Sequence, residues 1–125
     1  MTKEHIIEIH KLIIEKYQGK PGLFDENLLD SIVGCINQTF GGKELYPTVI
    51  DKAARLSYGL NKNHVFYDGN KRVATVVLLV YLRKYKYRFN PSPDELYNYV
   101  LGVANNSISF EEYIKWIKEN SVLIT

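Results

Sequence analysis

Cysteine is almost missing from the sequence, because the 125 residues contain only Cys35. One thiol cannot build a disulfide framework or a cysteine-based zinc site, so the sequence excludes both a disulfide-rich and a zinc-stabilised small protein. The apolar helical pattern around Cys35 instead predicts a buried, unreactive core thiol. A chain of this length can bury a sufficient hydrophobic core unaided, and we expect one domain covering residues 1–125.

A strong excess of one charge is also missing, since 16 Lys and Arg face 14 Asp and Glu for a net charge of +2. Lys and Glu are mixed along the expected helices, which argues against nucleic acid or membrane as direct partners. The longest apolar run, residues 73–82, is far short of the roughly 20 residues that a spanning helix needs. The charged, amphipathic start lacks a signal-peptide pattern, so we expect a cytoplasmic protein.

Strand patterns are scarce, whereas helical patterns are frequent. Apolar residues recur at three- and four-residue steps in several segments that follow plausible caps or turns. Ser92 and Ser109 are each followed three residues later by a glutamate, as in a capping box. Six helices with short connections predict an all-α, compact six-helix bundle. The expected helices cover residues 3–17, 25–36, 48–60, 70–85, 92–105 and 109–120.

Two segments allow more than one secondary structure. Residues 70–85 are rich in β-branched side chains and allow a buried strand, but their length favours a helix. They are apolar on nearly every side, as expected for a central helix of a bundle. Residues 39–47 have no helical period and contain Gly41 and Gly42, which indicates a loop or a short β-hairpin.

The sequence His64-Val-Phe-Tyr-Asp-Gly-Asn-Lys-Arg72 stands between two expected helices. A helix N-terminus carries unpaired backbone N–H groups and a partial positive charge. Gly69 allows the backbone to approach an anion closely, so the segment predicts a phosphate site. Lys71 and Arg72 are two cations at the positive end of a helix, which makes most sense if an anion binds there.

The other side chains of this segment fit the same interpretation. Asp68 is the carboxylate best placed for Mg²⁺, and His64 offers an imidazole, the side chain most often used as a general base. Asn70 can cap the helix or donate to a phosphate oxygen, and Phe66 is expected to pack into the core. Singly, each residue has an ordinary explanation, since Asp-Gly and Gly-Asn are common turn dipeptides and a lone histidine is more often structural. Their combination within nine residues favours a functional site.

These nine residues resemble the core motif of Fic-domain proteins, H-x-F-x-[DE]-[AG]-N-[GK]-[KR]. Lys71 stands where adenylylating Fic enzymes have a glycine, and it resembles the Doc (death-on-curing) branch of the family. The stretch YQGKPGLFDENLLDSIVG, residues 17–34, is similar to the Doc-type segment R-Y-G-G-x-P-G-x-x-D. The resemblance covers nearly the whole chain and implies a compact all-α Fic fold.

The resemblance also implies an activity, that of a toxin from a toxin–antitoxin pair. Such a protein transfers phosphate from ATP, with Mg²⁺, to a Ser or Thr hydroxyl of a protein such as elongation factor Tu, and thereby inhibits translation. It implies His64 as the catalytic base, Asp68 as the residue serving the Mg²⁺-nucleotide, and Lys71 as a further catalytic residue. The phosphate-binding residues that it implies are Gly69, Asn70, Lys71 and Arg72.

Lys71 bears on which group is transferred. By resemblance, a lysine fills the anion hole that a glycine leaves open, so that ATP binds reversed and presents its γ-phosphate. Thr75 and Val76 depart from the related patterns, because many Fic enzymes have a second arginine at the first position and Doc has an asparagine at the second. Lys62 could add a positive charge before the motif. The alternatives are AMP or NMP transfer to a protein hydroxyl and a non-catalytic Fic-like binding domain.

Regulation and target binding give two further expectations from the resemblance. Self-inhibiting Fic enzymes carry [ST]-x-x-x-E-[GN], and the closest match here, Lys115-x-x-x-Glu119-Asn120, lacks the hydroxyl residue. We therefore expect a separate cognate antitoxin that docks a disordered segment. Residues 39–46 fall where the family has a flap that aligns the target peptide, and a plain connecting loop is the equal alternative.

Overall fold

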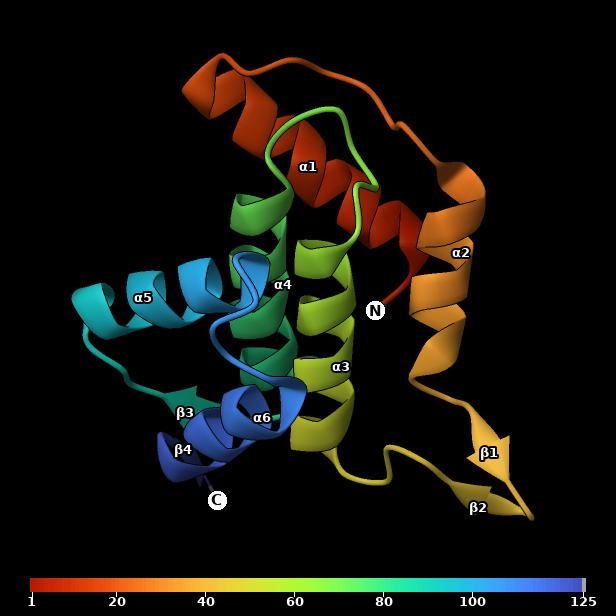
Figure 1. Ribbon diagram of the computed structural model, residues 1–125, viewed down its shortest axis with the longest axis vertical. Coiled ribbons are helices and arrows are strands. Elements are labelled where there is room, and N and C mark those ends of the chain that lie inside the picture. The colour runs from red at the N-terminus through yellow and green to blue at the C-terminus, as the bar shows by residue number, and fades with distance from the viewer. Residues whose placement is uncertain (125) are drawn as a thin grey trace.

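The computed structural model describes residues 1–124 and shows a helical bundle with two small strand pairs (Figure 1). Within these residues there are six helices, which confirms the all-α prediction. The elements are, in chain order, α1 (Lys3–Tyr17), α2 (Glu26–Cys35), β1 (Thr39–Phe40), β2 (Lys43–Glu44), α3 (Val49–Lys62), α4 (Asn70–Lys84), β3 (Tyr87–Phe89), α5 (Pro93–Ala104), α6 (Phe110–Glu119) and β4 (Ser121–Leu123).

Helices α3 and α4 lie side by side at the centre, and the other four helices pack around them (Figure 1). Leu56 and Leu60 of α3 and Val77 and Leu78 of α4 are all at most 1% exposed. The segment that also allowed a strand is therefore the helix α4. No helix among residues 1–124 combines the length and the apolar character needed to cross a membrane.

A buried polar contact joins three helices at this centre. The Ser57 hydroxyl of α3 donates to the carbonyl of Ala74 in α4 over 2.8 Å. Its only hydrogen is thereby used, so the Tyr113 hydroxyl of α6, also 2.8 Å away, is the donor to Ser57. Because each of these polar groups finds a partner, the contact fixes the helices without leaving a buried group unpaired.

Five of the six helices begin at the side-chain caps that the sequence predicts. In each, a cap oxygen accepts from the backbone N–H three residues later, which satisfies a donor that the helix cannot pair internally. The caps are Thr2, Asp25, Thr48, Ser92 and Ser109. Helix α4 differs, since it has no side-chain cap.

The structure corrects one expectation around the second helix. Helix α2 ends at Cys35, close to the expected end, and Gly41 and Gly42 form the turn between β1 and β2 at left-handed φ angles of 60° and 80°. Because Cys35 lies at the helix end, its thiol is only partly buried and donates to Gln38 over 3.6 Å. The prediction of a buried core thiol is therefore wrong.

Of the two alternatives for residues 39–47, a loop or a short hairpin, the structure shows the hairpin, with Thr39 paired to Glu44. It precedes the N-terminus of α3, whereas the motif follows the C-terminus of the same helix. A 14-residue helix is about 21 Å long, so the hairpin and the motif lie at opposite ends (Figure 1). This position does not suit a flap beside the motif, and the plain connection is the better interpretation.

A second strand pair, β3 with β4, is missing from the sequence prediction. Tyr87 pairs with Leu123 and Phe89 with Ser121 in antiparallel register. Each strand has three residues, which is too short to show an alternating pattern. The pair fastens the segment after α6 to the end of α4 that is distant from the motif.

Candidate active site

The motif loop between α3 and α4 lies antiparallel to residues 22–25. The backbone N–H of Phe24 donates to the Val65 carbonyl over 2.8 Å, and that of Tyr67 donates to Gly22 over 3.2 Å. Leu23 and Phe66 form an isolated antiparallel bridge between the two segments. The Gly- and Pro-rich stretch after α1 is thus the backbone support of the motif loop.

Phe66 anchors the loop in the core, as predicted, with 1% of its surface exposed. Its ring stacks on His10 of α1 with centroids 3.9 Å apart and an angle of 8° between the planes. His10 is 3% exposed, and its Nε2 lies 2.9 Å from the Asp68 carbonyl. A carbonyl only accepts, so this Nε2 carries the hydrogen. The sequence did not predict this role of His10, although a histidine among the apolar positions of residues 3–17 is a visible signal.

Asn70 is occupied with the same loop. Its side-chain oxygen accepts from the Phe66 N–H over 3.0 Å, and its Nδ2 donates to the Phe66 carbonyl over 2.9 Å. The amide therefore closes the loop and does not cap α4, where Asn70 is the first helical residue. The second hydrogen of its NH₂ group remains for a ligand, and a phosphate contact by Asn70 stays a prediction.

Asp68 presents an ionised carboxylate at the surface of this loop. Its Oδ2 accepts from the backbone N–H of Lys20 over 3.0 Å, and its Oδ1 accepts from that of Gly69 over 2.8 Å. These two hydrogen bonds lower the pKa of Asp68 below its usual 3.8, and the nearby positive charge of Arg72 lowers it further. The group is therefore fully charged near neutral pH.

Gly19 is the residue that gives the Asp68 carboxylate its space. A Cβ at this position would stand 2.5 Å from Asp68 Oδ2 and 2.9 Å from the end of the Ile14 side chain. Only glycine lets the two segments approach so closely. The partner of Gly19 is 49 residues away in the chain and could not be read from the sequence.

Helix α4 begins with an open N-terminus. Gly69 is its N-cap at a φ of 82°, a left-handed conformation that favours glycine, and no side chain caps the helix. Its first turn has no acidic residue but contains Lys71 and Arg72. Neither cation forms an ion pair with any carboxylate in residues 1–124. Unpaired N–H groups, the helix dipole and two unpaired cations make this end suited to an anion.

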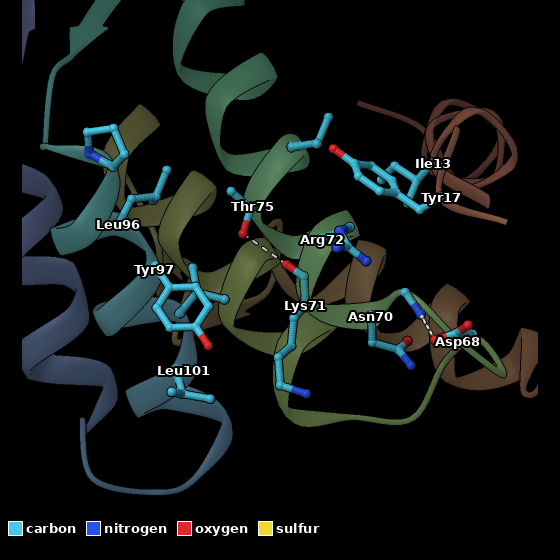
Figure 2. Close-up of a pocket in the computed structure, with 14 residues that line it drawn as sticks. Ile13, Tyr17, Asp68, Asn70, Lys71, Arg72, Thr75, Leu96, Tyr97 and Leu101 are labelled. Carbon is cyan, nitrogen blue, oxygen red and sulfur yellow. Dashed lines mark hydrogen bonds between the residues drawn. The ribbon is translucent and has the colours of Figure 1, made fainter. Parts of the chain in front are cut away.

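A cleft of about 630 Å³ opens in front of this helix end, between α1 and α5 (Figure 2). One end is polar and is formed by residues 68–72. The opposite walls are largely apolar and come from Ile13, Tyr17, Val76, Pro93, Leu96, Tyr97, Val100 and Leu101. The cleft therefore combines an anion-binding end with an apolar pocket.

The structure also shows how the residues at the entrance of α4 are held. The guanidinium of Arg72 lies 4.0 Å from the centroid of the Tyr17 ring, a cation–π contact with α1. The Thr75 hydroxyl donates to the Lys71 carbonyl over 2.9 Å, so Thr75 does not point a free donor into the cleft (Figure 2). Arg72 is thus placed by its aromatic neighbour, whereas the Lys71 ammonium has no ion-pair partner within the described residues 1–124.

His64 is set apart from the five predicted residues 68–72, which line one cleft. It is exposed, does not line the cleft, and contacts the ring of Phe24 with centroids 5.0 Å apart. Lys62 contributes no charge to the site, because its Nζ donates to the Val103 carbonyl and to Asn106 at the end of α5. The expected base and the open N-terminal end of α4 therefore occupy neighbouring surfaces of the same loop.

The residues present are compatible with Mg²⁺ brought by a nucleotide. No group of three or more His, Cys, Asp or Glu side chains gathers anywhere in residues 1–124, so a site made by the protein alone is missing there. Asp68 is ionised, and each of its oxygens accepts one hydrogen bond and has lone pairs to spare. Mg²⁺ commonly binds through one carboxylate together with phosphates and water, which this arrangement fits.

Comparisons with known proteins agree with the motif and the fold. A sequence model of the Fic/DOC family matches residues 1–82. The chain is 28% identical over 109 residues to "Protein kinase doc" of Escherichia phage P1, covering 87% of this chain and 85% of the relative. It is 38% identical over 66 residues to "Toxin Doc" of Mycolicibacterium smegmatis, covering 53% of this chain and 51% of that relative. The chain belongs to the Fic/Doc family.

Proposed function

We propose that this protein is a Doc-like toxin of a toxin–antitoxin pair that acts as a protein kinase in the cytoplasm. It would transfer the γ-phosphate of ATP to a Ser or Thr hydroxyl of a target such as elongation factor Tu, and so inhibit translation. The observation that carries the proposal is Lys71, an unpaired cation in the uncapped first turn of α4, at the mouth of the cleft. A similar protein that is named a kinase supports it.

The cleft suggests how ATP would be held. The apolar walls from α1 and α5 suit the adenine ring, and the open N-terminus of α4 suits the phosphates. Lys71 supplies a mobile point charge, whereas Arg72, placed against Tyr17, supplies a fixed planar fork. Asp68 would hold Mg²⁺, which neutralises phosphate charge when bound.

The transfer itself asks little covalent chemistry of the protein. His64 removes the proton of the target hydroxyl while the hydroxyl oxygen bonds to the γ-phosphorus. The bond from that phosphorus to the β–γ bridging oxygen breaks, and ADP leaves with the electron pair. The exposed position of His64 at the edge of the loop lets a bulky protein substrate reach it, while the nucleotide lies in the cleft.

Thr75 favours phosphate over AMP transfer. Thr75 stands where many Fic enzymes have a second arginine, and its hydroxyl is bonded to the Lys71 carbonyl. This turn of α4 therefore offers the cleft no second arginine to hold further phosphates. The positive charge is instead concentrated at Lys71 and Arg72, one turn earlier. Transfer of AMP is the competing outcome, and a non-catalytic binding domain is the third.

A separate antitoxin is part of the proposal. Lys115 and Glu119, which occupy the places of the missing self-inhibitory pattern, pair with each other over 3.9 Å and are both largely exposed. Helix α6 contributes no residue to the cleft walls. Helix α6, which carries this remnant of the pattern, therefore leaves the cleft open to a separate partner.

Labelled ATP tests the proposal directly. The purified chain is incubated with Mg²⁺, elongation factor Tu and ATP labelled at either the γ- or the α-phosphate, and His64→Ala serves as the inactive control. We expect label on the target only from the γ position and none with His64→Ala. Label from the α position alone would establish nucleotide transfer instead. Absence of both, with a folded protein, would favour the binding domain.

A further inference from the structure

Two aromatic side chains near His64 are exposed to solvent and are not part of the hydrophobic core. Phe24 is 54% exposed and Tyr67 is 44% exposed. Their rings meet edge to face with centroids 5.2 Å apart and an angle of 86° between the planes. We call Phe24 and Tyr67 the aromatic pair. It joins the support segment to the motif loop at the surface, although the sequence separates the two residues by 43 positions.

The aromatic pair is fixed in place. The backbone N–H of each residue donates to a carbonyl of the opposite segment, to Val65 and Gly22 respectively. The Tyr67 ring also lies against the backbone of Gly22, where an added Cβ would stand 3.1 Å from its Cδ2. The Lys20 ammonium lies 4.6 Å from the centroid of the same ring. A rigid aromatic surface loses little conformational freedom when it binds a partner.

The aromatic pair is continuous with the proposed base. Phe24 lies between the other two rings, since it also meets His64 edge to face at 5.0 Å and 73°. These side chains do not line the nucleotide cleft, so the pair faces the side from which a protein would reach His64. Burying an exposed aromatic ring against an apolar partner is favourable, and such residues often dominate interfaces.

We propose that the aromatic pair binds an apolar side chain of the protein substrate, next to the hydroxyl that receives the transferred group. The inference rests on the proposed transfer to a hydroxyl, but it does not depend on whether phosphate or nucleotide is transferred. Phe24 and Tyr67 then select substrates: a Ser or Thr flanked by an apolar residue is preferred over one flanked by charged residues.

Phe24→Ser is the test variant, because its backbone hydrogen bond to Val65 is kept while the ring is removed. Phe40→Ser is the matched control, since Phe40 is 80% exposed on the distant β1–β2 hairpin. Tyr67→Ser removes the other ring, and Phe24→Leu keeps an apolar side chain. Circular dichroism and thermal melting confirm that each variant is folded.

The first readout is the set of sites modified in a bacterial lysate supplied with ATP and Mg²⁺, located by mass spectrometry. We expect apolar residues to be enriched beside the sites modified by the parent chain and by Phe40→Ser. Phe24→Ser and Tyr67→Ser should lose this enrichment. If the parent shows no enrichment, the inference is overturned, while an added phosphate would leave the proposed function standing. If the folded parent modifies nothing, both fail.

The second readout separates substrate binding from orientation of His64. With the principal modified protein as substrate, Phe24→Ser should raise the KM for that protein about tenfold and leave the KM for ATP within about twofold. Phe24→Leu should restore most of the affinity. A fall in kcat with an unchanged KM for the protein would mean that Phe24 only orients the imidazole, and would overturn the binding role.

Discussion

The Nε2–H of His10 donates to the backbone carbonyl of Asp68 over 2.9 Å, which links a buried side chain of α1 to the motif loop. The same aspartate is held on its other side, where Lys20 and Gly69 donate to its carboxylate. Asp68 is therefore fixed at both its backbone and its side chain, and α1 determines where the proposed Mg²⁺ ligand lies.

The variant His10→Phe tests this link. A phenyl ring keeps the stack on Phe66 but removes the donor to Asp68, which should cost about 1 kcal/mol of unfolding free energy. Loss of the bond also loosens Asp68, so we expect the KM for ATP to rise several-fold. Denaturant unfolding and ATP titration of the transfer reaction measure the two effects.

His10→Gln provides the complementary change, since it keeps an N–H donor and loses the aromatic stack on Phe66. If the hydrogen bond is what matters to the nucleotide, Gln should retain more ATP affinity than Phe. The opposite order would show that the stack, and not the contact with Asp68, positions the loop.

Gly19→Ala should disturb the same aspartate from the other side. The added methyl group would stand 2.5 Å from Asp68 Oδ2, so the carboxylate must turn away. We expect lower affinity for Mg²⁺-ATP with the helical content unchanged, measured by calorimetry and circular dichroism. Gly34→Ala is the matched control, because nothing lies within 4 Å of its added Cβ inside α2. That change should stabilise the protein by about 0.5–1 kcal/mol and leave binding as it is.

The parts of this fold that could be predicted from the sequence are those set by neighbouring residues. Thr48 and Asp51 form a capping box because they stand three residues apart, and such spacings are visible in one dimension. The apolar periodicity of α1 and the packing of Phe66 follow from the same local patterns. The motif likewise lies within nine consecutive residues.

What could not be predicted depends on residues that folding brings together. Gly19 and Asp68 meet across 49 positions, and no local pattern records that distance. The site's division into a cleft and a separate His64 surface is of the same kind, because it depends on which way the loop turns. The sequence allows the hairpin at residues 39–47 as one of two alternatives, but its distance from the motif follows from the length and direction of α3.

Lys71→Met should remove the charge on which the proposed kinase activity depends. Methionine keeps the length and the helix propensity of lysine, so the fold should persist while transfer from γ-labelled ATP falls at least about a hundredfold. The control is Lys115→Met on α6, where the lysine is 79% exposed and does not line the cleft. Equal activity of both variants would exclude Lys71 from catalysis.

The loss of stability at alkaline pH should depend on the ionisation of the buried Tyr113 hydroxyl. Burial raises the pKa of its hydroxyl from 10.0 to about 12, so the unfolded chain loses this proton first. The stabilisation is fully present below pH 10 and disappears as the pH approaches 12, a change of about 2–3 kcal/mol. Tyr113→Phe should be less stable near neutral pH, because Ser57 loses its partner, yet its stability should fall less between pH 10 and 12. Denaturant midpoints across this range measure both effects, and Tyr97→Phe, at a tyrosine 66% exposed, should behave as the parent. Parallel pH profiles for Tyr113→Phe and the parent would show that Tyr113 ionises equally easily in the folded and unfolded chain.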